Sequence, residues 1–99
     1  MSFVTTQPAM LASAAGSLQA VGSAMAANNS AAAGPTSGVI PAAADEVSAL
    51  TATQFAVHAA MYEAISAEAT AIHQRFVATL STSAASYAAT EAASAIAAR

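Results

Sequence analysis

Gly34-Pro35-Thr36-Ser37-Gly38 is the stretch of sequence that decides the fold. Glycine and proline this close together are a strong turn signal, and the long alanine-rich runs on both sides favour helices. Proline suits the first turn of a helix because its missing N–H has no intrahelical partner there. Pro8 and Pro41 therefore mark two helix starts. We predict helices over about residues 8–32 and 41–84, a turn at residues 33–40, and a C-terminal tail at residues 85–99.

Large apolar side chains recur along one side of the second predicted helix at an average spacing close to 3.6 residues. This spacing favours a long, nearly straight helix over a tight heptad coil. The side consists of Val47, Leu50, His58, Met61, Ile65, Ile72, Phe76, Leu80 and Tyr87, with Phe55, Tyr62 and His73 at its margin. The first predicted helix has a shorter stripe that includes Leu11, Leu18 and Met25.

The unequal lengths of the two helices indicate an interface. At about 1.5 Å per residue, the first spans roughly 38 Å and the second roughly 65 Å. We therefore expect residues 72–87 to lack intrachain cover, and an exposed apolar stripe of this length is typical of a binding surface. The predicted fold is all-α: a two-helix antiparallel hairpin that completes an elongated four-helix bundle with a partner protein. The candidate interface residues are Leu11, Leu18, Met25, Phe55, Met61, Tyr62, Ile65, Ile72, Phe76 and Leu80.

Composition limits the classes of function. Of the 99 residues 57% are hydrophobic, but 33 are alanine, so few side chains can build a core. Two arginines against five acidic residues give a net charge of −3, which disfavours nucleic-acid binding. The chain has no cysteine, no Sec-type signal peptide and no run of about 20 strongly apolar residues that could span a membrane.

No residue pattern points to catalysis. His58 and His73 are the only histidines, and on one straight helix they lie some 22 Å apart, too far to share a metal ion. We expect both to be structural or interface residues. The chain lacks a phosphate-binding glycine loop and a nucleophile elbow. We therefore predict no enzyme activity, no cofactor, no metal and no small-molecule substrate.

Several segments together resemble the PE family of mycobacteria. They are the opening Met1-Ser2-Phe3-Val4, Pro8 with the alanine-rich first helix, residues 39–48 (Val-Ile-Pro-Ala-Ala-Ala-Asp-Glu-Val-Ser), and residues 87–91 (Tyr-Ala-Ala-Thr-Glu). The resemblance covers essentially the whole chain. One departure is that Pro8-Ala9 replaces the Pro-Glu pair of the family name, which weakens the first helical turn slightly. Because the chain ends at Arg99, it looks like the PE domain without the C-terminal extension of many relatives.

The resemblance implies a function in binding and transport. It implies an obligate heterodimer with a PPE protein, an EspG-type chaperone that binds the PPE chain, and export through a type VII (ESX) secretion system to the outside or the cell surface. It also implies a Tyr-x-x-x-Asp/Glu export signal, which Tyr87 and Glu91 match. Two alternatives remain open from the residues alone. One is a homodimeric four-helix bundle with a structural or envelope role. The other is a lipid-surface helix, which the lack of a Lys/Arg-rich face disfavours.

Overall fold

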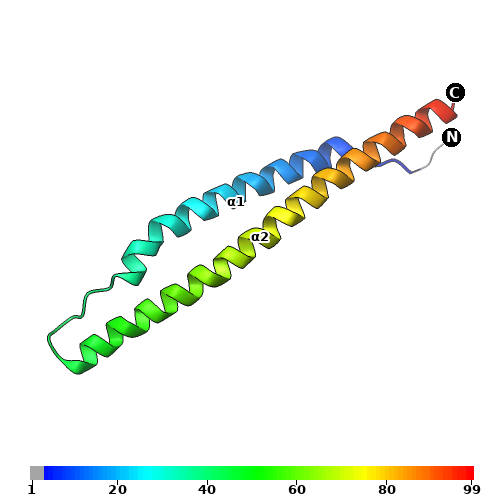
Figure 1. The fold of residues 1–99 in the computed structure, drawn as a ribbon. Helices are drawn as coiled ribbons and strands as arrows, with labels where there is room; N and C mark the ends of the chain where they lie inside the picture. The colour runs from blue at the N-terminus through cyan, green and yellow to red at the C-terminus, as the bar shows by residue number, and fades with distance from the viewer. Residues whose placement is uncertain (1–3) are drawn as a thin grey trace. The chain divides into compact units, whose positions relative to one another are not determined.

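Two α-helices make up most of the computed structural model, which describes residues 4–99. α1 spans Pro8–Ser37 and α2 spans Glu46–Ala97 (Figure 1). No strand occurs among these described residues. The all-α fold is therefore confirmed, and two long helices are consistent with the predicted hairpin. The four-helix bundle with a partner stays a prediction. Neither helix combines the length and the apolar character that a membrane span needs.

α1 ends later than the sequence predicts, because it runs through Pro35 to Ser37 instead of ending near residue 32. Pro35 lies in the last turn, so its missing N–H leaves only one backbone bond unmade, and only two helical residues follow it. The hydroxyl of Thr36 donates a hydrogen bond to the Ala32 carbonyl at 2.7 Å, and that of Ser37 donates to the Ala33 carbonyl at 2.6 Å. Threonine and serine side chains commonly make such bonds to the carbonyl four residues earlier in a helix.

α2 begins at Glu46 and not near residue 41, because Asp45 supplies the N-cap. Its Oδ1 accepts the Ser48 backbone N–H at 2.8 Å, and its Oδ2 accepts the Ser48 hydroxyl at 2.9 Å. The helix continues to Ala97, so most of residues 85–99 are helical and do not form a separate tail. No glycine or proline follows Pro41, which explains why nothing interrupts α2.

The chain divides into two compact units, and each helix contributes to both. The first unit consists of Met1–Gly22 and His73–Arg99, and the second of Ser23–Ile72. Within each unit a stretch of α1 lies beside a stretch of α2 (Figure 1).

Small side chains fill the contact between the helices. Ala15 and Ala84 are buried in the first unit, and Ala52 and Ala59 in the second. No large side chain is fully buried anywhere in residues 4–99. A buried methyl group contributes far less than the roughly 1.5–3 kcal/mol of a buried Leu, Ile or Phe side chain. Intrachain packing alone is therefore a weak source of stability for this chain.

The α2 positions with reduced exposure follow a seven-residue repeat. Ala52, Ala59, Ser66, His73 and Leu80 are each buried or half-buried and lie seven residues apart. This is the spacing of a coiled-coil seam. Apart from Leu80 and the marginal His73, which belong to both sets, the residues with the predicted 3.6-residue spacing lie on a neighbouring side of the helix, where most of the large apolar residues are. α1 therefore does not pack on the side of α2 that carries most of the large apolar residues.

The prediction that residues 72–87 lack intrachain neighbours was wrong. His73 is half-buried and its Nε2 atom lies 2.7 Å from the Leu18 carbonyl oxygen of α1. Farther along α2, Glu91 accepts hydrogen bonds from Thr6, which precedes α1. The helices are joined by residues 38–45, five residues farther along the chain than the predicted turn, and α1 is longer than predicted. The beginning of α1 therefore lies beside the last third of α2.

Candidate functional site

Tyr87 and Glu91, the residues of the expected export signal, lie one helical turn apart on α2. Tyr87 is 46% exposed and takes no part in the alanine core. Glu91 is half-buried. The expected signal would therefore combine an accessible aromatic ring with a carboxylate that is partly enclosed by the protein.

Thr6 binds the Glu91 carboxylate through two donors. The Thr6 backbone N–H donates to Glu91 Oε1 at 2.9 Å, and the Thr6 hydroxyl donates to the same oxygen at 2.8 Å. These bonds, the backbone bond first and the hydroxyl bond second, hold the pKa of the Glu91 carboxyl below its usual value. Sequence reasoning missed Thr6 as a site residue. No sequence pattern connects two residues that stand 85 positions apart.

The second candidate feature is a row of large apolar side chains on α2 that α1 leaves uncovered. Val47 is 74% exposed, Ile65 is 63% exposed and Phe76 is 55% exposed. We call this row the apolar stripe, and it consists of Val47, Leu50, Met61, Ile65, Ile72 and Phe76. The predicted interface residues divide into two groups. Leu11, Leu18 and Leu80 are half-buried between the helices, whereas Met25, Phe55, Met61, Tyr62, Ile65, Ile72 and Phe76 are exposed.

In the first unit, exposed apolar residues of both helices lie on one side of the helix pair. On α1, Met10 immediately precedes the half-buried Leu11, and on α2, Phe76 immediately precedes the half-buried Val77. One step back along a helix rotates the side chain by about 100°. Because the two segments run antiparallel, the same rotation on each directs Met10 and Phe76 to the same side. Met10 of α1 and Phe76 of α2 thus contribute to the same exposed side of the first unit.

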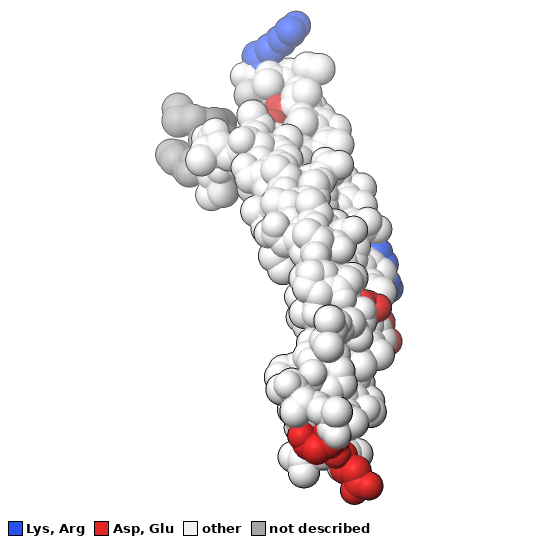
Figure 2. Space-filling view, turned by 90° about the vertical axis from the view of Figure 1, so that its left-hand side faces the viewer, with Lys and Arg blue, Asp and Glu red and all other residues white. Residues whose placement is uncertain are grey.

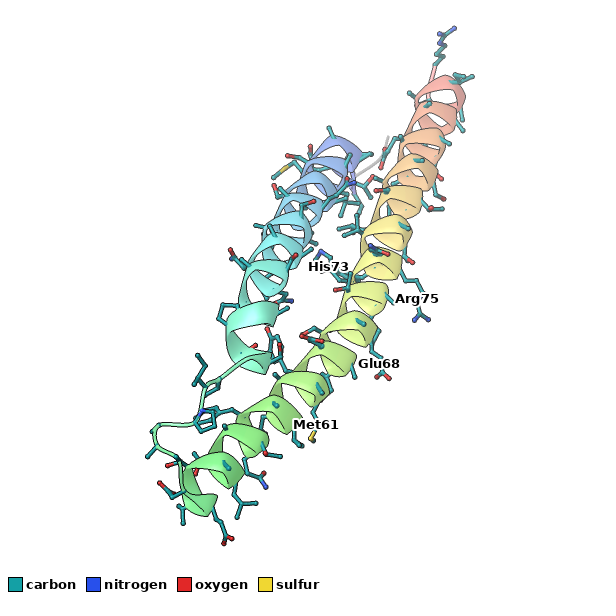
Figure 3. The ribbon with its side chains drawn as sticks, turned by 60° about the vertical axis from the view of Figure 1, so that its left-hand side comes forward. Met61, Glu68, His73 and Arg75 are labelled. Carbon is teal, nitrogen blue, oxygen red and sulfur yellow. The ribbon has the colours of Figure 1, made fainter. Side chains whose placement is uncertain are left out.

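The face of the molecule in Figure 2 carries few charged side chains. On α2, Figure 3 shows His73 pointing toward α1, whereas Glu68 and Arg75 point away from it. This distribution matches the sequence, in which the first 44 residues contain no charged side chain. A surface with so few charges is suited to being covered by another protein.

The second unit contains an open, mostly apolar groove of about 490 Å³. His58, Tyr62 and Asn29 contribute polar groups to its lining. The Tyr62 hydroxyl donates a hydrogen bond to Asn29 Oδ1 at 2.8 Å. The groove is lined by Asn29, Ala32, Ala33, Pro35, Thr36, Val39, Phe55, His58, Ala59 and Tyr62. Within the described part of the chain, no group of three or more His, Asp or Glu side chains could hold a metal ion.

Comparison with known proteins places these features in a family. Residues 4–94 match the sequence model of the PE family. The chain is 64% identical over 98 residues to PE family protein PE13 of Mycobacterium tuberculosis strain H37Rv, with 99% of both chains covered. It is 52% identical to PE family protein PE8 of that strain, over 92% of this chain but 33% of PE8. It is also 53% identical to PE-PGRS family protein PE_PGRS33, over 96% of this chain but 19% of that protein.

Proposed function

The chain belongs to the PE family, and from this premise we propose that it is a non-enzymatic partner of a PPE protein. The two chains form an obligate heterodimer that an EspG-type chaperone binds through the PPE chain and that a type VII (ESX) secretion system exports. The complex is cytoplasmic before export and is then secreted or held at the cell surface. Tyr87 and Glu91 form this chain's part of the export signal.

The observation that carries the proposal is the contrast between the core and the apolar stripe. The buried core consists of alanines, whereas Val47, Ile65, Phe76 and the rest of the stripe are more than half exposed. Each of these side chains contributes roughly 1.5–3 kcal/mol when a partner buries it fully. Folding and binding are therefore coupled, and the lone chain is poorly folded or aggregates.

The position of the stripe supports a helical partner. The exposed residues lie to one side of the α1–α2 contact, as they do when a second helix pair packs against the first to make a four-helix layer. Such an obligate interface buries more than about 2,000 Å² in total. Alanines at the contact between α1 and α2 also let the helix axes approach to about 8 Å.

Co-expression with a PPE protein, ideally one encoded beside this chain, tests the proposal. We expect light scattering to give the mass of a 1:1 complex, and the chain expressed alone to be insoluble. A soluble, cooperatively folded homodimer that ignores the PPE protein would contradict the proposal, because a second copy would then cover the apolar stripe. That outcome would support a homodimeric four-helix bundle with a structural or envelope role.

A further inference from the structure

The Glu91 carboxylate is held by a residue outside the Tyr-x-x-x-Glu segment. Thr6 donates its backbone N–H at 2.9 Å and its hydroxyl at 2.8 Å, and both bonds end at Oε1. Thr6 and Glu91 are each half-buried, so this contact is partly shielded from water. Hydrogen bonds to an ionised carboxylate are shorter and stronger than neutral ones.

This contact fixes an otherwise mobile side chain. A glutamate near the end of a helix samples many rotamers, and the two bonds from Thr6 restrict it to those in which Oε1 faces the segment before α1. Tyr87 lies one turn earlier on α2 and remains 46% exposed. With the carboxylate held by Thr6, one of the two groups of the signal already has a fixed place on α2 before a receptor binds, which lowers the entropy cost of that binding.

We propose that Thr6 is a positioning residue of the export signal, so that the signal consists of Tyr87, Glu91 and the segment before α1 that contains Thr6. This inference rests on the proposed function of Tyr87 and Glu91. Thr6 contacts no receptor in this scheme. It acts through Glu91, whose carboxylate it holds at a fixed place beside Tyr87. The competing interpretation is that the contact only anchors the start of the chain to α2.

Three substitutions separate these interpretations. Thr6→Val has nearly the same shape but lacks the hydroxyl donor, while Thr6→Ser retains both donors. Thr5→Val is the matched control because the neighbouring Thr5 is exposed and the two bonds to Glu91 come from Thr6. Each variant is co-expressed with the PPE partner. The mass of the complex, its melting temperature and the fraction exported are then measured at equal amounts of intracellular complex.

We expect Thr6→Val to form the complex with unchanged mass and to be exported roughly fivefold less, which corresponds to the loss of one hydrogen bond of about 1 kcal/mol. Thr6→Ser and Thr5→Val should be exported like the wild type. Normal export of Thr6→Val would overturn the inference, and so would a complex that no longer assembles, because the role of Thr6 would then be structural.

Glu91→Gln distinguishes failure of this inference from failure of the proposed signal. If Glu91→Gln blocks export but Thr6→Val does not, the signal stands and Thr6 has no positioning role in it. If Glu91→Gln is also exported normally, Glu91 is not part of the signal, and both the signal and the role of Thr6 are refuted.

Discussion

The imidazole ring of His73 occupies the space that a side chain at Gly22 would need. A Cβ atom at Gly22 would lie 2.8 Å from both Cδ2 and Nε2 of His73, which is closer than atoms of this kind approach. The same Nε2 atom lies 2.7 Å from the Leu18 carbonyl oxygen. Because a carbonyl oxygen only accepts hydrogen bonds, Nε2 carries the proton. The missing side chain at Gly22 thus lets His73 reach the backbone of α1.

We expect Gly22→Ala to destabilise the folded complex by about 1–2 kcal/mol. The added methyl group overpacks the contact with His73, which costs about 1–3 kcal/mol. Displacement of the His73 ring also breaks its hydrogen bond to the Leu18 carbonyl. The higher helix propensity of alanine offsets only about 1 kcal/mol of this loss. In a His73→Ala background the same substitution should be stabilising. Urea unfolding of the four proteins of this double-mutant cycle measures the difference.

Gly16→Ala is the control, since a Cβ atom at Gly16 meets nothing within 4 Å. It should stabilise the complex by about 1 kcal/mol through helix propensity alone. Equal effects of Gly16→Ala and Gly22→Ala would show that His73 does not need the space at Gly22.

Gly22 also illustrates what could be predicted from the sequence and what could not. The two helices follow from Pro8, the Gly-Pro pair and the alanine-rich runs, because these signals are local. The side of α2 that meets α1 is not a local property. The large residues suggested one side, whereas the small residues at Ala59 and Ala84 provide the contact. Alanine occurs on every side of both helices, so the seven-residue repeat of small residues at the contact cannot be recognised from the alanine positions alone.

The same reasoning applies to the two candidate functional features. The exposed residues of the proposed interface were predictable as candidates, since large apolar side chains stand out in an alanine-rich chain. The contact between Thr6 and Glu91 was not, because it depends on the alignment of the chain before α1 with the end of α2. That alignment is set by the connection at residues 38–45, which lies five residues farther along the chain than the predicted turn at residues 33–40.

A larger side chain at Ala59 should separate the helices of the second unit. Ala59 is only 6% exposed, and extra methylene groups at a packed position cost about 1–3 kcal/mol. We therefore expect Ala59→Leu to lower the free energy of unfolding of the complex by that amount. Ala60→Leu is the matched control, because Ala60 is exposed and substitutions at such positions stay within about 0.5 kcal/mol. Chemical unfolding that gives equal stabilities for the two variants would argue against a closely packed alanine contact.

The N-cap of α2 should make stability depend on pH in acid. The bonds from the Ser48 N–H and hydroxyl hold the pKa of the Asp45 carboxyl below its ordinary value of 3.8. The stabilisation is therefore present above that value and is lost as the pH falls through the lower pKa of the folded state. Asparagine caps a helix about as well as aspartate and does not titrate.

The comparison of wild type with Asp45→Asn isolates this effect, because all other carboxyl groups are shared. Above about pH 5 the wild type should be at least as stable as the variant, since the charged cap also interacts favourably with the helix dipole. Below the pKa of Asp45 the variant should be the more stable of the two. The melting temperatures of the wild type and of Asp45→Asn are measured across the pH range. If the two curves of melting temperature against pH stay parallel, titration of Asp45 does not affect stability.

Tyr87 should be needed for export and dispensable for assembly. Its ring is 46% exposed and lies outside the alanine core, so its removal leaves the helix contact intact. We expect Tyr87→Ala to form the complex with normal mass and to remain in the cell. Tyr87→Phe, which lacks only the hydroxyl, shows whether the ring alone is sufficient. Normal export of Tyr87→Ala, together with normal partner binding, would remove Tyr87 from the signal.

The apolar stripe should tolerate no charge. Ile72 is 62% exposed, so Ile72→Asp places its carboxylate in water as long as the chain is unbound. Binding of the partner would bury that charge without a counterion, which costs several kcal/mol. We therefore expect the heterodimer to be lost. Phe76→Ala removes a large exposed side chain from the same stripe that the partner would bury, and it should also weaken binding of the partner.

Gln74→Glu is the matched control for this substitution. Gln74 is exposed and also lies on α2, but two residues after Ile72 the helix has turned by about 200°, so Gln74 lies opposite the apolar stripe. If the stripe is the binding surface, Gln74→Glu should still co-purify with the PPE protein while Ile72→Asp does not. Retention of the partner by both variants would mean that another surface binds it. Loss by both would mean that the added charge does not act through the stripe, which would then have no special role.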